Sequence, residues 1–290
     1  MKPLSILIAW MFAAPGWASN GSTPVPPCES HPCSIDATVG RVDLRMHNKA
    51  AQDVLNGVLH DATFWQGASH SSYDKKLYDE IRLKDTSSGY VPMITGEGDE
   101  DYPAEVVADI VFRRNTDIPR HMSGAKAVVN LGSGYDSSVG AEYRDSFYLL
   151  DLTVFYGHFA QRMYRKYDES QKQHVMWFEK LDESFVDAAT WAAYQAKMTQ
   201  TIDNLDKRWA FNSIIEVTDV YGMFVVTPGE ELESRVTFVS KLTFGDGTGF
   251  IAKVGSQMPM VIKAGLKSGF DACVAIARDE KHKRLGSPAP

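Results

Sequence analysis

The chain has 290 residues, of which 44% are hydrophobic, 23% charged and 11% aromatic, and its formal net charge is −7 at pH 7. The acidic balance argues against a nucleic-acid partner, because phosphates are neutralised by clustered Lys and Arg side chains. It also gives no attraction to anionic lipid surfaces. The composition is that of a globular protein with enough aromatic residues for a large core.

Residues 1–18 have the three parts of a secretory signal peptide. Lys2 gives the positive start, residues 4–14 form an apolar run, and Gly16 and Ala18 are the small residues before a cut. The run is too short to cross a bilayer as a stable helix, although a retained membrane anchor is the alternative. We therefore expect cleavage after Ala18 and a periplasmic or secreted mature protein of about 270 residues. No later stretch has the roughly 18 apolar residues of a transmembrane span.

Residues 19–35 are rich in Pro and Ser, which is typical of a tether without regular structure. Because exported proteins meet oxidising conditions, Cys28 and Cys33 are expected to form a small disulfide loop. The alternative is a metal ion held by both cysteines and His31, but a structural zinc site needs a fourth ligand, and none is near in sequence. We expect no metal and no cofactor. Cys273 lies in a helical pattern and is expected to be a buried, small hydrophobic residue.

Residues 36–88 are expected to form an N-terminal helical extension. Apolar residues recur at helical spacing around Val54 and Leu55, and again over residues 73–83. A tail at residues 285–290 is expected to be disordered.

From residue 89 onward, strands and helices are expected in the following order: strand 90–95, helix 103–113, strand 125–131 closed by Gly132, strands 141–152, 159–167 and 174–181, helix 191–209, strands 221–227 and 235–244, and a long helix from 251 or 259 to 283. In strand 235–244, apolar residues such as Val236 and Phe238 alternate with polar ones. This pattern is typical of an antiparallel sheet with one buried face. In helix 191–209, the expected apolar stripe is Ala192, Gln195, Met198, Ile202 and Leu205.

Four short motifs carry a resemblance to a known family. Residues 103–107 (PAEVV), 117–120 (DIPR) and 124–128 (GAKAV) follow one another as in the opening of START-like (helix-grip) domains. Residues 249–254 (GFIAKV), before the terminal helix, resemble the close of the same domains, although many members have a proline where this chain has Ala252.

The resemblance covers residues 89–284. It implies an α+β helix-grip fold, in which a curved antiparallel sheet wraps around a long C-terminal helix. It also implies a cavity between sheet and helix for a hydrophobic molecule; lipids, sterols and aromatic polyketides are typical of the superfamily. Most members bind or carry such molecules and some are enzymes. Residues 36–88 and 191–209 lie outside the usual pattern, and their role stays open.

The candidate ligand-binding residues are Arg144, Tyr148, Arg162, Tyr164, Trp177, Phe178, Glu179, Phe224, Phe238, Met258, Ile262 and Leu266. For any single apolar member, burial in a filled core is the favoured explanation. The three charged members sit in apolar patterns, where they would either fix a ligand head group or form cross-strand ion pairs. Alternation alone does not say which face of each strand meets the helix.

The sequence lacks recognisable catalytic motifs such as Gly-x-Ser-x-Gly, a Walker loop or His-Glu-x-x-His. His121, His158 and His174 are scattered without metal-ligand spacing, and each is expected to be a surface or hydrogen-bonded histidine. No catalytic residue is therefore assigned.

The expected function is an exported carrier for a lipid or other hydrophobic small molecule, with residues 245–257 as a lid. Gly265 and Gly269 are expected to let the terminal helix approach another backbone closely. One alternative is an enzyme of cyclase or hydrolase type on the same scaffold. Another is a protein-interaction module with a filled cavity, in which residues 36–88 or 191–209 bind a partner.

Overall fold

The computed structural model describes residues 42–72, 80–86, 89–99, 103–152, 155–205, 214–229, 234–244 and 259–284. The predicted signal peptide, the tether, the Cys28–Cys33 pair, the 245–257 lid and Met258 lie outside the described residues, and they stay predictions.

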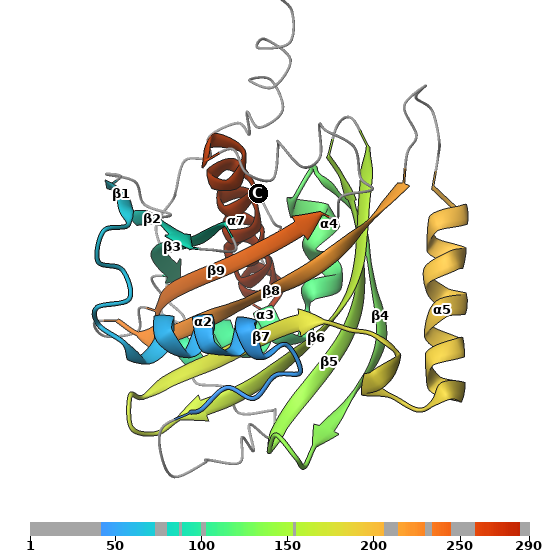
Figure 1. The fold of residues 1–290 in the computed structure, drawn as a ribbon, viewed down its shortest axis with the longest axis horizontal. Coiled ribbons are helices and arrows are strands. Elements are labelled where there is room, and N and C mark those ends of the chain that lie inside the picture. The colour runs from blue at the N-terminus through green and yellow to red at the C-terminus, as the bar shows by residue number, and fades with distance from the viewer. Residues whose placement is uncertain are drawn as a thin grey trace, which may run out of the picture.

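A curved antiparallel sheet of nine strands forms the body of the molecule (Figure 1). The strands are β1 (Ser69–Ser72), β2 (Glu80–Thr86), β3 (Gly89–Asp99), β4 (Ala125–Asp136), β5 (Ala141–Asp151), β6 (Tyr156–Asp168), β7 (Gln173–Lys180), β8 (Ile214–Pro228) and β9 (Ser234–Phe244). Their order across the sheet is β1-β2-β3-β9-β8-β7-β6-β5-β4, and a short parallel contact also joins β8 to β6.

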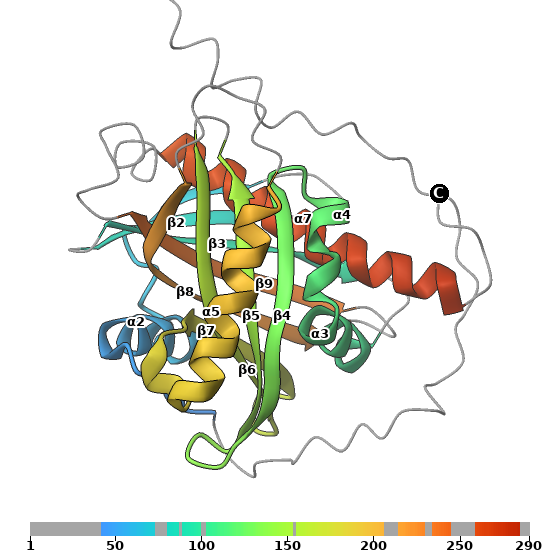
Figure 2. The same cartoon turned by 90° about the vertical axis from the view of Figure 1, so that its right-hand side faces the viewer.

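Helices cover both faces of this sheet (Figures 1 and 2). They are α2 (Lys49–His60), α3 (Ala104–Arg113), α4 (Ile118–His121), α5 (Ala188–Asp203) and α7 (Pro259–Arg284), with short 3₁₀ turns η1 (Asn115–Asp117) and η2 (Glu183–Phe185). We call the face toward α3 and α7 the inner face, and the face toward α2 and α5 the outer face. The order of elements and the long terminal helix confirm the predicted α+β helix-grip architecture.

One predicted helix is wrong in its described part. Residues 73–83 were expected to be helical, but Glu80–Thr86 is strand β2, which pairs with β3. Burial along β2 alternates, with Ile81 and Leu83 buried between more exposed neighbours, so its periodicity is two residues. The segment before residue 89 therefore gives the sheet two strands as well as helix α2.

Three other predicted boundaries shift. Strand β4 continues past Gly132 to Asp136, and β8 begins at Ile214 instead of residue 221. Helix α5 begins at Ala188, because the Asp187 side chain accepts hydrogen bonds from two backbone N–H groups of its first turn.

The side of α5 that faces the sheet matches the predicted stripe at Met198 and Ile202, and at Leu205 just after the helix, but differs from it at Ala192 and Gln195. Trp191, Tyr194 and Met198 pack toward the sheet, whereas Ala192 and Gln195 are exposed. The large aromatic side chains of the helix therefore set its buried side.

Candidate functional site

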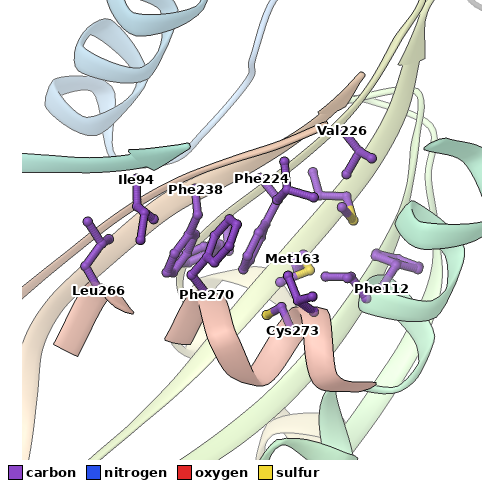
Figure 3. Close-up of a cluster of buried hydrophobic side chains, with 14 of the residues drawn as sticks. Ile94, Phe112, Met163, Phe224, Val226, Phe238, Leu266, Phe270 and Cys273 are labelled. Carbon is purple, nitrogen blue, oxygen red and sulfur yellow. The ribbon is translucent and has the colours of Figure 1, made fainter. Parts of the chain in front are cut away.

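The layer between the inner face and α7 is apolar and aromatic. Figure 3 shows Leu266 and Phe270 on α7 facing Ile94 and Phe238 of the sheet, with Cys273 of the same helix close to Met163. The same cluster includes Met163, Phe178 and Phe224, and the rings of Phe224 and Phe238 stack with centroids 4.3 Å apart. This is the layer in which the sequence places a ligand.

The two glycines of α7 play different parts in this layer. A Cβ atom at Gly269 would lie 3.1 Å from the Phe238 ring, so the helix comes close to the sheet there. A Cβ atom at Gly265 would meet no atom of the described residues within 4 Å. Among these residues neither glycine approaches another backbone as expected; at Gly269 the close neighbour is the side chain of Phe238.

Helix α3 also packs against the inner face. Two arginines of that face hold the helix by hydrogen bonds. Arg165 donates from Nη1 to Oδ1 of Asp109 at 2.7 Å, and Arg144 donates from Nη1 to the carbonyl oxygen of Arg113 at 2.6 Å. Burial opposes ionisation of Asp109, but hydrogen bonds from Arg113 and Arg165 outweigh it and lower the pKa of this carboxyl. Predicted site residue Arg144 is thus on the inner face, at the C-terminus of α3.

A neutral polar cluster interrupts the apolar layer beside these arginines. Its members are Asn115 of η1, Ser146 and Tyr148 of β5, and Gln161 of β6, with exposed fractions of 3%, 0%, 7% and 4%. The side-chain nitrogen of Asn115 donates to Oγ of Ser146 at 2.8 Å and to the Tyr148 hydroxyl at 3.3 Å. The side-chain nitrogen of Gln161 donates to the same hydroxyl at 3.3 Å.

The hydrogen bonds within this cluster do not use all of its donors and acceptors. Oδ1 of Asn115 is buried without a hydrogen-bond partner among the described residues. The Tyr148 oxygen accepts two N–H groups, while none of the described residues accepts its hydroxyl hydrogen. Burial raises the pKa of Tyr148, so the phenol stays a neutral O–H donor. An acceptor and a donor therefore lie together, both unused, inside an apolar layer.

Four of the predicted ligand-binding residues lie on the outer face, which corrects their assignment. Met163 of β6 pairs with Phe178 of β7, and both belong to the inner cluster. Since side chains alternate along a strand, their neighbours point the opposite way. These neighbours are the pairs Arg162 with Glu179 and Tyr164 with Trp177.

The other predicted residues fall as follows. Tyr148, Phe178, Phe224, Phe238 and Leu266 belong to the inner cluster. Ile262 is half-buried on α7. The structure thus brings together about half of the predicted site and adds Asn115, Ser146 and Gln161, which sequence reasoning missed.

A sequence signal existed for two of the three missed residues. Ser146 and Gln161 are polar residues in apolar strands, and they pair with each other across β5 and β6. Ser146 also lies two positions from Tyr148, so both side chains are on the same face of β5. Asn115 arrives from a separate 3₁₀ turn, and no periodicity could have placed it there.

On the outer face, a buried ion pair fastens α5. Arg162 donates from Nε and Nη2 to the two carboxylate oxygens of Asp145, both at 2.7 Å, and the Tyr194 hydroxyl donates to the same carboxylate at 3.1 Å. Burial works against the charge of Arg162, but Asp145 outweighs it and raises the pKa of the guanidinium. A side chain at Gly132 would collide with the Tyr194 hydroxyl, so this glycine lets α5 dock.

Other outer-face residues fasten the segment that leads into α2. Glu179 accepts hydrogen bonds from the backbone N–H groups of His47 and Asn48 at 3.0 and 2.9 Å. Trp177 donates from Nε1 to the carbonyl oxygen of Arg45 at 3.2 Å. These two residues therefore hold a covering segment in place.

His174 differs from its expected role as a surface or hydrogen-bonded histidine. The residue is 5% exposed, and its Nδ1 has no hydrogen-bond partner among the described residues. Burial and then the charge of Arg165 lower its pKa to about 4, against a smaller opposite effect of Asp109. The ring is neutral at pH 7.

Within the described ranges, three or more His, Cys, Asp or Glu side chains do not gather in a geometry that could hold a metal ion. No helix there combines the length and the apolar character that crossing a bilayer requires.

Comparison with known proteins identifies the fold. No family model and no curated protein sequence matches the chain. Among solved structures, human STARD10 has a TM-score of 0.52 at 9% identity, covering 85% of this chain and 88% of that one. The STAR-related lipid transfer protein of Xanthomonas axonopodis gives 0.49 at 11%, covering 73% and 99%. A Streptomyces aromatase/cyclase gives 0.40 at 11%, covering 72% and 99%. The chain has the START-like helix-grip fold.

Proposed function

We propose that this protein is an exported binding protein, which holds an apolar small molecule between the inner face and α7 and carries it through an aqueous compartment. The observation that supports this most is the neutral polar cluster inside the apolar layer. Its unused donor on Tyr148 and unused acceptor on Asn115 are costly to bury unless something pairs with them.

The chemistry of the layer suits an amphipathic guest. Removal of an apolar body from water would drive binding, and aromatic rings such as Phe224, Phe238 and Phe270 would surround it. A few placed polar groups in an otherwise apolar site fix orientation. Export rests on the sequence of residues 1–18, and the START-like fold is consistent with binding in this layer.

The protein-interaction alternative receives less support. An exposed apolar stripe on residues 191–209 would support it, but Trp191, Met198 and Ile202 pack against the outer face. Binding of a partner by residues 36–88 stays open. The enzyme alternative would be supported by an inward-facing His, Asp or Glu with a perturbed pKa. His174 on the inner face has a lowered pKa, but among the described residues no hydrogen bond joins it to the neutral polar cluster.

Native mass spectrometry of the mature, exported protein tests the proposal. We expect the folded protein to carry an added mass that solvent extraction releases as an apolar molecule with one polar end. The proposal would be contradicted if the exported protein carried no bound molecule and also showed no saturable binding of compounds with an apolar chain.

A pair of variants tests the location. Cys273 is buried in the layer, close enough to Tyr148 to influence its ionisation. Cys273→Phe should therefore lower the amount of bound molecule. Ala193→Phe adds comparable bulk at an exposed position of α5 and should leave it unchanged. Equal loading of both folded variants would place the molecule elsewhere.

A further inference from the structure

The inner layer also indicates which kind of polar end its guest carries, an inference that rests on the proposed function. The Tyr148 hydroxyl receives two N–H groups and keeps its own hydrogen, while Oδ1 of Asn115 receives none from the described residues. The Tyr148 hydroxyl and Oδ1 of Asn115 therefore offer a donor and an acceptor close together. The Ser146 hydroxyl, which accepts from Asn115, and Nε of Arg144 are further donors without an acceptor among the described residues. A partner that completes the pair of Tyr148 and Asn115 must itself accept and donate, which a hydroxyl does and a carboxylate does not.

The charges around the cluster point the same way. Its four members are uncharged, and each is at least nine-tenths buried. Placing an ionised head group among them would carry a large desolvation cost, which only a cation beside the head group could offset.

Arg144 is the cation that could offset such a charge. Its guanidinium is directed at the C-terminus of α3, where it donates to the Arg113 carbonyl oxygen. A cation is favourable at a helix C-terminus, so Arg144 already has a structural task. Burial lowers the pKa of Arg144. The nearby Tyr148 raises this pKa, and the charge of Arg113 lowers it further.

We propose that the guest is an apolar molecule whose polar end is a single uncharged hydroxyl, and that this hydroxyl accepts from Tyr148 and donates to Oδ1 of Asn115. The apolar body then extends from β5 and β6 along the rings of Phe224 and Phe238 toward α7. The class comprises long-chain or polycyclic alcohols.

Three probes of equal chain length separate the possibilities: decanol, decanoate and methyl decyl ether. Competition against a fluorescent apolar probe gives the affinity of each for the mature protein. We expect decanol to bind about tenfold more tightly than the ether, which accepts but cannot donate, because roughly one buried hydrogen bond is lost. Decanoate should bind more weakly than decanol.

Two matched variants locate the effect. Tyr148→Phe removes only the inner hydroxyl, so the preference for decanol over the ether should shrink several-fold. Tyr164→Phe makes the same change on the outer face, where the hydroxyl lies 3.4 Å from Oδ2 of Asp136, and should leave the preference intact.

Each outcome decides the matter. Tightest binding of decanoate by the wild type would overturn the inference and implicate Arg144. Equal binding of all three probes would also overturn it, and would mean that the cluster bonds only to itself and to water. Saturable binding of none of them would instead argue against the proposed function. The wild-type order of affinities is decisive even if Tyr148→Phe does not fold.

Discussion

The two faces of the sheet bury polar groups in different ways. On the outer face, the Asp145 carboxylate accepts hydrogen bonds from Arg162 and Tyr194, and the Glu179 carboxylate accepts hydrogen bonds from two backbone N–H groups. On the inner face, the neutral polar cluster bonds mainly to itself and leaves Oδ1 of Asn115 without a partner among the described residues.

This difference separates structural from binding roles. A polar group that is fully paired to a covering segment stabilises that segment, as Glu179 does for the start of α2. A buried group with unused capacity has no such explanation within the fold, and it marks where another molecule can bind. Burial alone would not separate the two faces, because Trp177 on the outer face and Phe270 on the inner face are both completely buried.

The largest expected effect comes from breaking the outer-face ion pair. Asp145→Ala leaves Arg162 buried and uncompensated, so we expect the free energy of unfolding to fall by about 3–5 kcal/mol. Urea denaturation measures it. Glu216→Ala removes the partner of Lys180 from a pair in which Glu216 is 60% exposed, and should cost less than about 1 kcal/mol. Similar losses in both variants would mean that Asp145 does not fasten α5 as described.

The next effect concerns pH and inner-face residue His174. Its folded-state pKa is lowered to about 4, against roughly 6.5 in an unfolded chain. The unfolded state therefore binds a proton that the folded state does not, and stability falls as pH drops from about 6.5 to about 4, by up to about 3 kcal/mol.

His174→Phe should remove this part of the pH dependence. Urea denaturation of wild type and variant at several pH values across that window measures the difference, and measurements near neutral pH report any packing change separately. Parallel curves for the two proteins would show that His174 is protonated equally in both states.

The smallest effect distinguishes the two glycines of α7. Gly265→Ala adds a methyl group where no atom of the described residues lies within 4 Å, so improved helix propensity should raise the free energy of unfolding by up to about 1 kcal/mol. Gly269→Ala places its Cβ atom 3.1 Å from Phe238, and this crowding should cancel the gain. Equal stabilisation by both changes would contradict the close packing of α7 at Gly269.

Periodicity predicted most of the strands and helices correctly, but it failed where two periods compete over a short segment. Residues 80–83 fit a helical stripe through Ile81, and pairing with β3 makes them a strand instead. In α5, the predicted stripe followed Ala192 and Gln195, while Trp191 and Tyr194 have more apolar surface to bury and turn the helix toward the sheet.

The candidate site was predictable in part. Alternation puts Tyr148 and Ser146 on the same face of β5, and it separates Arg162 and Tyr164 from Met163 on β6. Alternation does not say which face of the sheet packs against α7, because it only divides the residues of a strand into two sets on opposite faces.

The sequence by itself determined the order of elements from residue 89 onward, the alternation of strand 235–244 and the resemblance that predicted a helix-grip fold, since these depend on residues close together in the chain. Only the tertiary structure decided that Arg162 and Glu179 hold covering segments while Tyr148 meets Asn115 and Gln161. Those partners lie 13 to 132 residues apart in sequence. Such contacts form only when the sheet curves and helices pack on both its faces. A local sequence pattern therefore does not predict which distant residue becomes the hydrogen-bond partner.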